Sequence, residues 1–147
     1  MTGVGSQSLT TIERTVRNAD RKLTISSVQD LDVYRRLVVL HLEIHRETLS
    51  FPRFEMYELG SQIRRSSNSI PANLAEGWNN KHSMMYLEGI NRGESELRET
   101  KHHLWIAHQK GYLEKERYTE LFDRYDGCAR MLHRLKEAIA RSVNRGR

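Results

Sequence analysis

The sequence predicts an all-α protein that folds as one antiparallel, up-down-up-down four-helix bundle. Apolar residues recur at intervals of three and four over long stretches, and no segment shows the strict alternation of a half-buried strand. These stretches are long enough for helices of about 20 to 28 residues, and the connections between them are short, as in antiparallel bundles. The chain of 147 residues has the length of a single domain.

Composition limits the class of protein. Hydrophobic residues make up 37% of the chain and charged residues 29%. The hydrophobic fraction is large enough for a core but too small for a membrane protein. No run approaches the roughly 20 apolar residues of a transmembrane helix, and Met1–Ser8 lacks the apolar segment of a signal peptide. The single cysteine, Cys128, cannot form an intramolecular disulfide, so we expect a cytoplasmic protein without membrane contact.

Positive charge is concentrated at the C-terminus. The net charge is +5, yet residues 31–140 carry 17 Lys and Arg against 16 Asp and Glu. The last seven residues add Arg141, Arg145 and Arg147 with no acid. We therefore divide the chain into a flexible N-terminal arm over residues 1–25, the bundle over residues 26–140 and a basic tail over residues 141–147. Such a tail permits binding to nucleic acid.

The first helix is expected to start after Ser26 or Ser27, since either serine can cap it, and to end near Leu49. The second helix is expected from about Glu55 to Trp78. Their apolar stripes are Val33, Leu37, Leu40 and Ile44 in the first helix, and Met56, Leu59, Ile63, Ser67, Ile70 and Leu74 in the second.

Pro71 lies inside the stripe of the second helix. Proline cannot donate a hydrogen bond to the Ser67 carbonyl, and its ring crowds that carbonyl, so we expect a kink there. Two shorter helices that break near Asn68 are the alternative. The apolar register continues unbroken across Pro71, which favours the kinked helix.

The third helix is expected from Ser83 to about Lys110, with Gly111 as its C′ residue. It contains Gly89 and Gly93, each of which costs about 1 kcal/mol relative to Ala unless a neighbouring helix packs very close. The fourth helix is expected to begin at Glu114. It has the most regular stripe, with a sustained heptad pattern: Tyr118, Leu121, Tyr125, Cys128, Leu132, Leu135 and Ile139.

The segment Ser61–Gly77 is unusual for a helix interior. It contains Q-I-R-R followed by S-I-P-A-N-L-A-E-G, and it closely resembles the signature of the 23S rRNA intervening-sequence protein family, also called four-helix bundle proteins. Glu94–Thr100 and Gly111–Leu113 are similar to further segments of that family. The resemblance covers roughly residues 30–140.

The resemblance implies a role in assembly. Some members are encoded inside intervening sequences of large-subunit rRNA genes. Related bundle proteins are the accessory variability determinants of diversity-generating retroelements, which form pentamers and act with a reverse transcriptase and nucleic acid. The implied partners are further copies of this chain in a homopentamer, RNA or DNA, and a reverse transcriptase. The family has no catalytic residues to transfer, and we expect no enzyme activity and no cofactor.

Two groups of residues are candidates for function. The expected nucleic-acid-binding residues are Arg64, Arg65, Lys81, Arg141, Arg145 and Arg147. Pro71, Asn73, Glu76 and Gly77 are expected to be structural, with Asn73 and Glu76 satisfying backbone groups freed by the proline. A binding face on the polar side of the second helix is the alternative for these polar residues, and Arg64–Arg65 can equally be a solvated pair or form ion pairs.

Catalytic and metal-binding patterns are weak. His41 and His45 are four apart, but Glu43 lies in the wrong place for H-E-x-x-H, and we expect no metal site. Cys128 lies on a core stripe and is expected to be a small buried hydrophobe. The predicted function is a non-catalytic, homo-oligomeric bundle that binds nucleic acid or a nucleic-acid enzyme. The alternative is a protein-binding or structural module with no nucleic-acid role.

Overall fold

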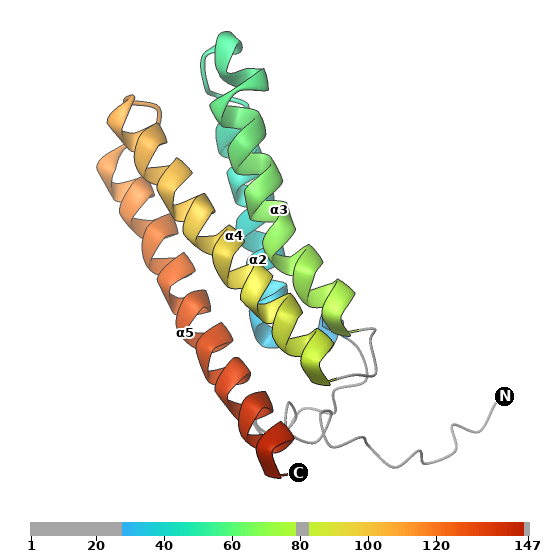
Figure 1. Cartoon of the computed structure of the whole chain (residues 1–147). Coiled ribbons are helices and arrows are strands. Elements are labelled where there is room, and N and C mark those ends of the chain that lie inside the picture. The colour runs from blue at the N-terminus through green and yellow to red at the C-terminus, as the bar shows by residue number, and fades with distance from the viewer. Residues whose placement is uncertain (1–27, 79–82, 146–147) are drawn as a thin grey trace, which may run out of the picture.

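The computed structural model describes residues 28–78 and 83–145. In this part of the chain there are four long helices and two short 3-10 helices, and no strand. The long helices are α2 (Asp32–Thr48), α3 (Leu59–Trp78), α4 (Ser83–Gln109) and α5 (Lys115–Arg145), and the short ones are η1 (Val28–Asp30) and η2 (Arg53–Tyr57). Successive long helices run in opposite directions (Figure 1), which confirms the predicted all-α antiparallel bundle.

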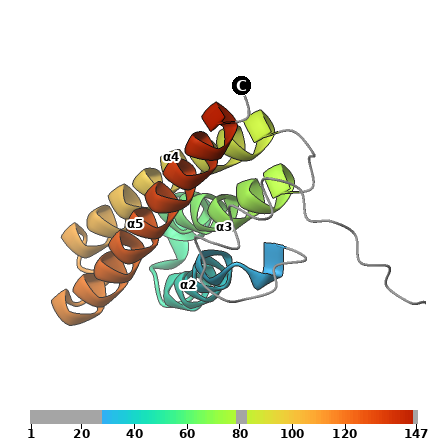
Figure 2. The same cartoon turned by 90° about the horizontal axis from the view of Figure 1, so that it is seen from below.

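The predicted apolar stripes form one core. Seen from below, α3 packs against α2 on one side and α4 on the other, and α5 packs against α4 and α2 (Figure 2). The heptad stripe of α5 is buried from Leu121 to Ile139, and Leu37, Ile63 and Leu104 from the other helices are 1% exposed or less. Burial of these side chains is the main source of stability, at about 25 cal/mol per Å² of apolar surface.

The first helix starts later than predicted. α2 begins at Asp32, and its N-cap is Leu31, which makes no side-chain capping hydrogen bond. Before it, η1 turns the chain, and the Leu31 amide donates to the Val28 carbonyl at 3.0 Å. The predicted arm over residues 1–25 and the predicted caps Ser26 and Ser27 lie outside the described residues.

The predicted start of the second helix, at about Glu55, is also wrong. Arg53–Tyr57 forms η2, and α3 begins only at Leu59, because Glu58 leaves helical geometry with φ −114° and ψ −109°. Met56, predicted for the core, is 46% exposed, whereas Glu55 is 1% exposed. Lys110 donates to the buried Glu55 carboxylate at 3.2 Å, so this ion pair holds η2 against the end of α4.

α3 is continuous through Pro71, which is buried. The alternative of two helices broken near Asn68 is therefore excluded, while the kink stays a prediction. Because proline has no backbone N–H, Pro71 leaves the Ser67 carbonyl without its helical hydrogen-bond donor. The Ser67 hydroxyl bonds the Arg64 carbonyl at 3.2 Å instead, so it does not serve the freed group.

The C-terminal ends of α4 and α5 can be compared with the predicted ends. Gly111 has φ +82°, and the Tyr112 amide donates to the Ala107 carbonyl at 2.9 Å, which confirms Gly111 as the C′ residue of α4. α5 continues to Arg145, so the helix runs five residues past the boundary predicted at residue 140. Val143 explains the extension, because it packs against the core four residues after Ile139.

No helix within the described ranges combines the length and the apolar character that crossing a membrane requires.

Candidate nucleic-acid interface

The second half of α5 carries a stripe of exposed arginines, which we call the arginine stripe: Arg130, Arg134, Arg141 and Arg145. Their spacing of four, seven and four places them within about 60° of one another around a helix of 3.6 residues per turn. The buried heptad residues lie on the opposite side of the helix. The arginine stripe therefore faces solvent along the outside of the bundle.

None of these four arginines has an ionic partner among the described residues, unlike Arg35, Arg65 and Lys136 elsewhere in the bundle. Lys136 lies between them in sequence but points to α4, where it pairs with Glu94 at 2.6 Å. The one acid in this half of α5, Glu137, lies 2.9 Å from His133. Sequence reasoning found Arg141 and Arg145 and missed Arg130 and Arg134, although the helical spacing that links all four could have revealed them.

The first half of α5 has the opposite charge on the same outer face. Glu116, Glu120 and Asp123 are exposed, and at 3.6 residues per turn they continue the line of the arginine stripe toward the N-terminus of the helix. Gly127 lies between the two halves. The outer face of α5 is therefore acidic at one end and basic at the other.

The other predicted arginines are used inside the chain. Arg64 is half-buried and donates to the Thr48 hydroxyl at 3.0 Å and to the Met56 carbonyl at 2.6 Å, so it fastens the connection between α2 and α3. Arg65 is exposed but pairs with Glu99 on α4 at 3.3 Å. Lys81 and Arg147 lie outside the described residues.

The predicted structural residues gather where α3 crosses α4. Asn73, Glu76 and Gly77 line a small hollow of about 30 Å³ together with Gly89 and Arg92. The Asn73 amide donates to the Ser69 carbonyl at 2.7 Å, so the expectation that it serves the carbonyl freed by Pro71 is wrong. Glu76 is exposed and lies at the rim of this hollow.

Small hydroxyl groups connect the helices inside the core. The Thr100 hydroxyl donates to Ser66 Oγ at 2.9 Å, and Ser67 Oγ lies 2.8 Å from His41 Nδ1. Burial, with a smaller contribution from the charge of His45, lowers the pKa of His41. The contact with Ser67 orients His41 toward α3. Among the described residues, no group of three or more His, Cys, Asp and Glu side chains is arranged to hold a metal ion.

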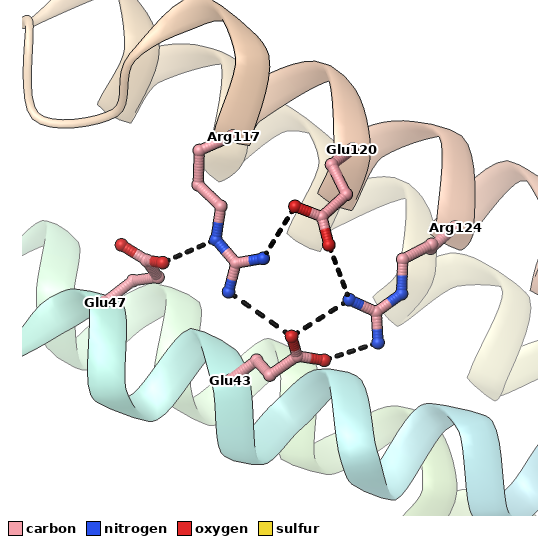
Figure 3. A network of polar contacts seen from close by, with 5 residues as sticks. All are labelled: Glu43, Glu47, Arg117, Glu120 and Arg124. Carbon is pink, nitrogen blue, oxygen red and sulfur yellow. Dashed lines mark hydrogen bonds and ion pairs between the residues drawn. The ribbon is translucent and has the colours of Figure 1, made fainter.

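A network of five charged residues joins α2 to α5 (Figure 3). Arg117 bonds Glu47 at 2.5 Å, Glu120 at 2.9 Å and Glu43 at 3.3 Å, and Arg124 bonds Glu43 and Glu120. The hydrogen bond from Arg124 lowers the pKa of Glu43, against the opposing effect of burial. The network aligns α2 with the first half of α5.

Beside this network, residues of α2 and α5 line a groove of about 540 Å³. Its walls include Val39, Leu40, Gly127 and Cys128, with Asp123 and arginines at the rim. Burial raises the pKa of the Cys128 thiol to about 11, so the thiol is neutral and serves as an apolar wall, as predicted for a core cysteine.

The sequence was compared with known proteins and protein families. No curated protein matches the chain. The model of one family, described as 23S rRNA-intervening sequence protein, matches residues 29–134, from η1 to the middle of α5. Arg141 and Arg145 lie beyond the matched residues. Because the match covers well over half of the sequence, the chain belongs to the 23S rRNA-intervening sequence protein family.

Proposed function

We propose that the protein is a non-catalytic, self-associating bundle of the cytoplasm that binds nucleic acid through the last turns of α5. One observation carries the proposal: Arg141 and Arg145 are exposed, four residues apart and without an ionic partner in the described chain, and no Asp or Glu follows Glu137 in the sequence. Arg130 and Arg134, in contrast, share the outer face of α5 with Asp123 and Glu120 a few turns away.

The spacing of the two outer arginines suits a phosphate backbone. Residues four apart on a helix are separated by about 6 Å along its axis, and a guanidinium group binds phosphate through two parallel hydrogen bonds. Two arginines per chain give weak binding, and several copies in one particle strengthen it through avidity. The resemblance supports this proposal, since it implies a five-copy assembly that acts with nucleic acid and a reverse transcriptase. A reverse transcriptase and a template repeat encoded beside this gene would support that narrower role.

A salt titration tests the proposal. We expect the double variant Arg141→Gln/Arg145→Gln to bind RNA and DNA more weakly than the unchanged protein. Its plot of log affinity against log salt should also be less steep, because each lost phosphate contact removes a slope of about 0.9 on duplex DNA or 0.7 on single strands. These glutamines keep the helix intact, whereas truncation after Ala140 would also remove the packing of Val143.

Arg46→Gln is the matched control, because Arg46 is an exposed arginine of α2 with no ion pair in the described chain. It should leave the affinity and the slope unchanged. Equal binding and an equal slope for the double variant would remove Arg141 and Arg145 from the interface. Absence of any binding at low salt would overturn the nucleic-acid role.

A protein-binding module is the second candidate, and one observation favours it. Leu49, Phe54 and Tyr57 are 69%, 68% and 86% exposed at the connection between α2 and α3. Exposed apolar residues grouped in this way mark contact sites for other proteins. If the protein binds no nucleic acid, this apolar end is the surface to examine by substitution.

A further inference from the structure

We propose that the groove between α2 and α5 holds one unpaired base of a single-stranded nucleic acid. The inference rests on the nucleic-acid binding proposed above and names the class of strand that is bound. Three features of the groove carry it: an apolar floor, a glycine that keeps one wall open, and opposite charges at the two ends.

The groove has the size and the lining of a ligand site. Its volume of about 540 Å³ lies within the range of about 300–1,000 Å³ that small-molecule pockets occupy. Val39, Leu40 and Cys128 supply the apolar surface, and Val39 is 49% exposed. A flat ring that lies against these side chains removes apolar surface from water, which favours binding.

Gly127 keeps the α5 wall of the groove open. It lies in the middle of a helix of 31 residues, where glycine is less favourable than alanine. At Gly77 and Gly89 the neighbouring helix explains the glycine, since an added Cβ would lie 3.0 Å and 2.8 Å from backbone oxygens. An added Cβ at Gly127 would meet only the end of the Arg130 side chain, at 3.8 Å. Packing within the described chain does not require this glycine, whereas a ligand in the groove needs the space.

The two ends of the groove carry opposite charges. Arg124, next to Asp123 in the sequence, donates to Glu43 at 3.0 Å, so Asp123 lies near the level of Glu43. Arg36 precedes Glu43 by seven residues, which is about 10 Å along α2, and Arg130 follows Asp123 by the same number of residues on α5. Because α2 and α5 are antiparallel (Figure 1), Arg36 and Arg130 lie toward the same end, about 10 Å along the bundle from Asp123.

These charges are available to a ligand. Asp123 and Arg130 are exposed, and neither has an ionic partner in the described chain. Arg35 and Arg36 both pair with Asp32, and their side chains are 49% and 62% exposed. A guanidinium group carries five N–H donors, so Arg36, which donates to Asp32 through Nε, can bind a phosphate as well.

A nucleotide matches this arrangement. Its base is a flat aromatic ring that suits the apolar floor, and its phosphate suits the arginine end. A carboxylate accepts a hydrogen bond from the exocyclic amino group of cytosine, so a base at the Asp123 end finds an acceptor. The base must be unpaired, because a base inside a duplex is stacked and its pairing edge is occupied. Arg134, about one helical turn beyond Arg130, extends the basic surface toward the next phosphate.

An abasic strand tests the proposal in the full-length protein. Oligo(dC) and an abasic strand of the same length carry the same phosphates, and only the first carries bases. The unchanged protein should bind oligo(dC) about tenfold more tightly, a factor within the range that one base held against protein surface contributes. Gly127→Leu, which fills the groove, should remove this difference and leave the affinity for the abasic strand unchanged. Thr119→Leu is the matched control and should retain the difference, because Thr119 is exposed on the same helix and does not line the groove.

Asp123→Asn tests the acidic end of the groove. The unchanged protein should prefer oligo(dC) to oligo(dT) several-fold, because thymine has no exocyclic amino group to donate to Asp123. The asparagine amide can donate as well as accept, so the variant should lose this preference. The ratio of the two affinities is the measurement, since the loss of a negative charge by itself raises the affinity for both strands. A preference that survives in Asp123→Asn would contradict the proposed position of the base.

The outcomes separate this inference from the proposed function. Equal binding of oligo(dC) and the abasic strand overturns the groove proposal alone, because binding through phosphates would remain. Retention of the difference by Gly127→Leu, shown by circular dichroism to be folded, overturns it as well. Displacement of oligo(dC) by free CMP at the same concentration would assign the groove to a free nucleotide and reject the single strand. Absence of binding to every strand at low salt overturns the proposed function itself.

Discussion

Single glycines decide how closely α3 and α4 approach. Gly77 and Gly89 face each other at the crossing, and an added Cβ on Gly77 would lie 3.3 Å from the Gly89 Cα atom. Gly93, one turn further along α4, is different, because its nearest neighbour would be the Ile70 carbonyl oxygen at an ordinary 3.5 Å. The same residue type therefore permits helix contact at one position and only weakens the helix at another.

Gly89→Ala should destabilise the bundle by about 1–3 kcal/mol, the usual cost of inserting a group into a tightly packed site. Its Cβ would lie 2.8 Å from the Asn73 carbonyl oxygen, which belongs to the backbone and cannot rotate away. Gly93→Ala is the matched control and should be neutral or stabilising by up to about 1 kcal/mol. Denaturant unfolding measures both. Equal effects of the two substitutions would show that the crossing is looser than described.

At the scale of helices, charged contacts between distant segments fix the position of α2 against α5. Glu43 accepts hydrogen bonds from both Arg117 and Arg124, and these pairs are only partly exposed. They are therefore stronger than a typical surface pair, which contributes about 0.2–1 kcal/mol.

Glu43→Gln should lower the free energy of unfolding at neutral pH by about 1–2 kcal/mol, because it weakens two charge-assisted hydrogen bonds. The pKa of Glu43 is lowered in the folded state, so its contribution is complete above the ordinary pKa of 4.5 and is lost as the pH falls through the lower, folded value. The difference between variant and unchanged protein should therefore shrink in acid. Glu137→Gln, which affects only an exposed pair with His133, should change stability by less than about 0.5 kcal/mol. A Glu43→Gln effect independent of pH would contradict this assignment.

Pro71→Ala examines a single helix. α3 is already continuous on both sides of the proline, so the substitution should leave the helical circular dichroism unchanged. It restores a donor for the Ser67 carbonyl and alters a buried contact, so packing or assembly should change instead. A clear gain of helicity with unchanged assembly would show that Pro71 ends a helix in solution.

For the whole molecule, self-association links stability to concentration. If folded chains associate and unfolded chains do not, the unfolding temperature should rise when the protein concentration is raised about a hundred-fold. A concentration-independent unfolding temperature for the unchanged protein would contradict self-association.

Much of the fold could be predicted because helices have a local signal. The heptad of α5, the C′ glycine Gly111 and the continuous register across Pro71 are all properties of neighbouring residues. The candidate site was predicted in part, since the acid-free end of the chain was visible and the wider arginine stripe was not. The stripe becomes evident only when residues fifteen apart are placed on one helical surface.

The sequence by itself determined that this chain forms four helices, which faces of them are buried and where net positive charge collects. Only the tertiary structure decided which charges remain free. Arg64 and Arg141 are both arginines of a helix, but Arg64 is held by Thr48 and Met56, whereas Arg141 is exposed. Glu55 was expected at a helix start and is instead buried against Lys110, 55 residues away. The physical reason is that periodicity depends on neighbours along the chain, whereas ion pairs depend on which helices the core brings together.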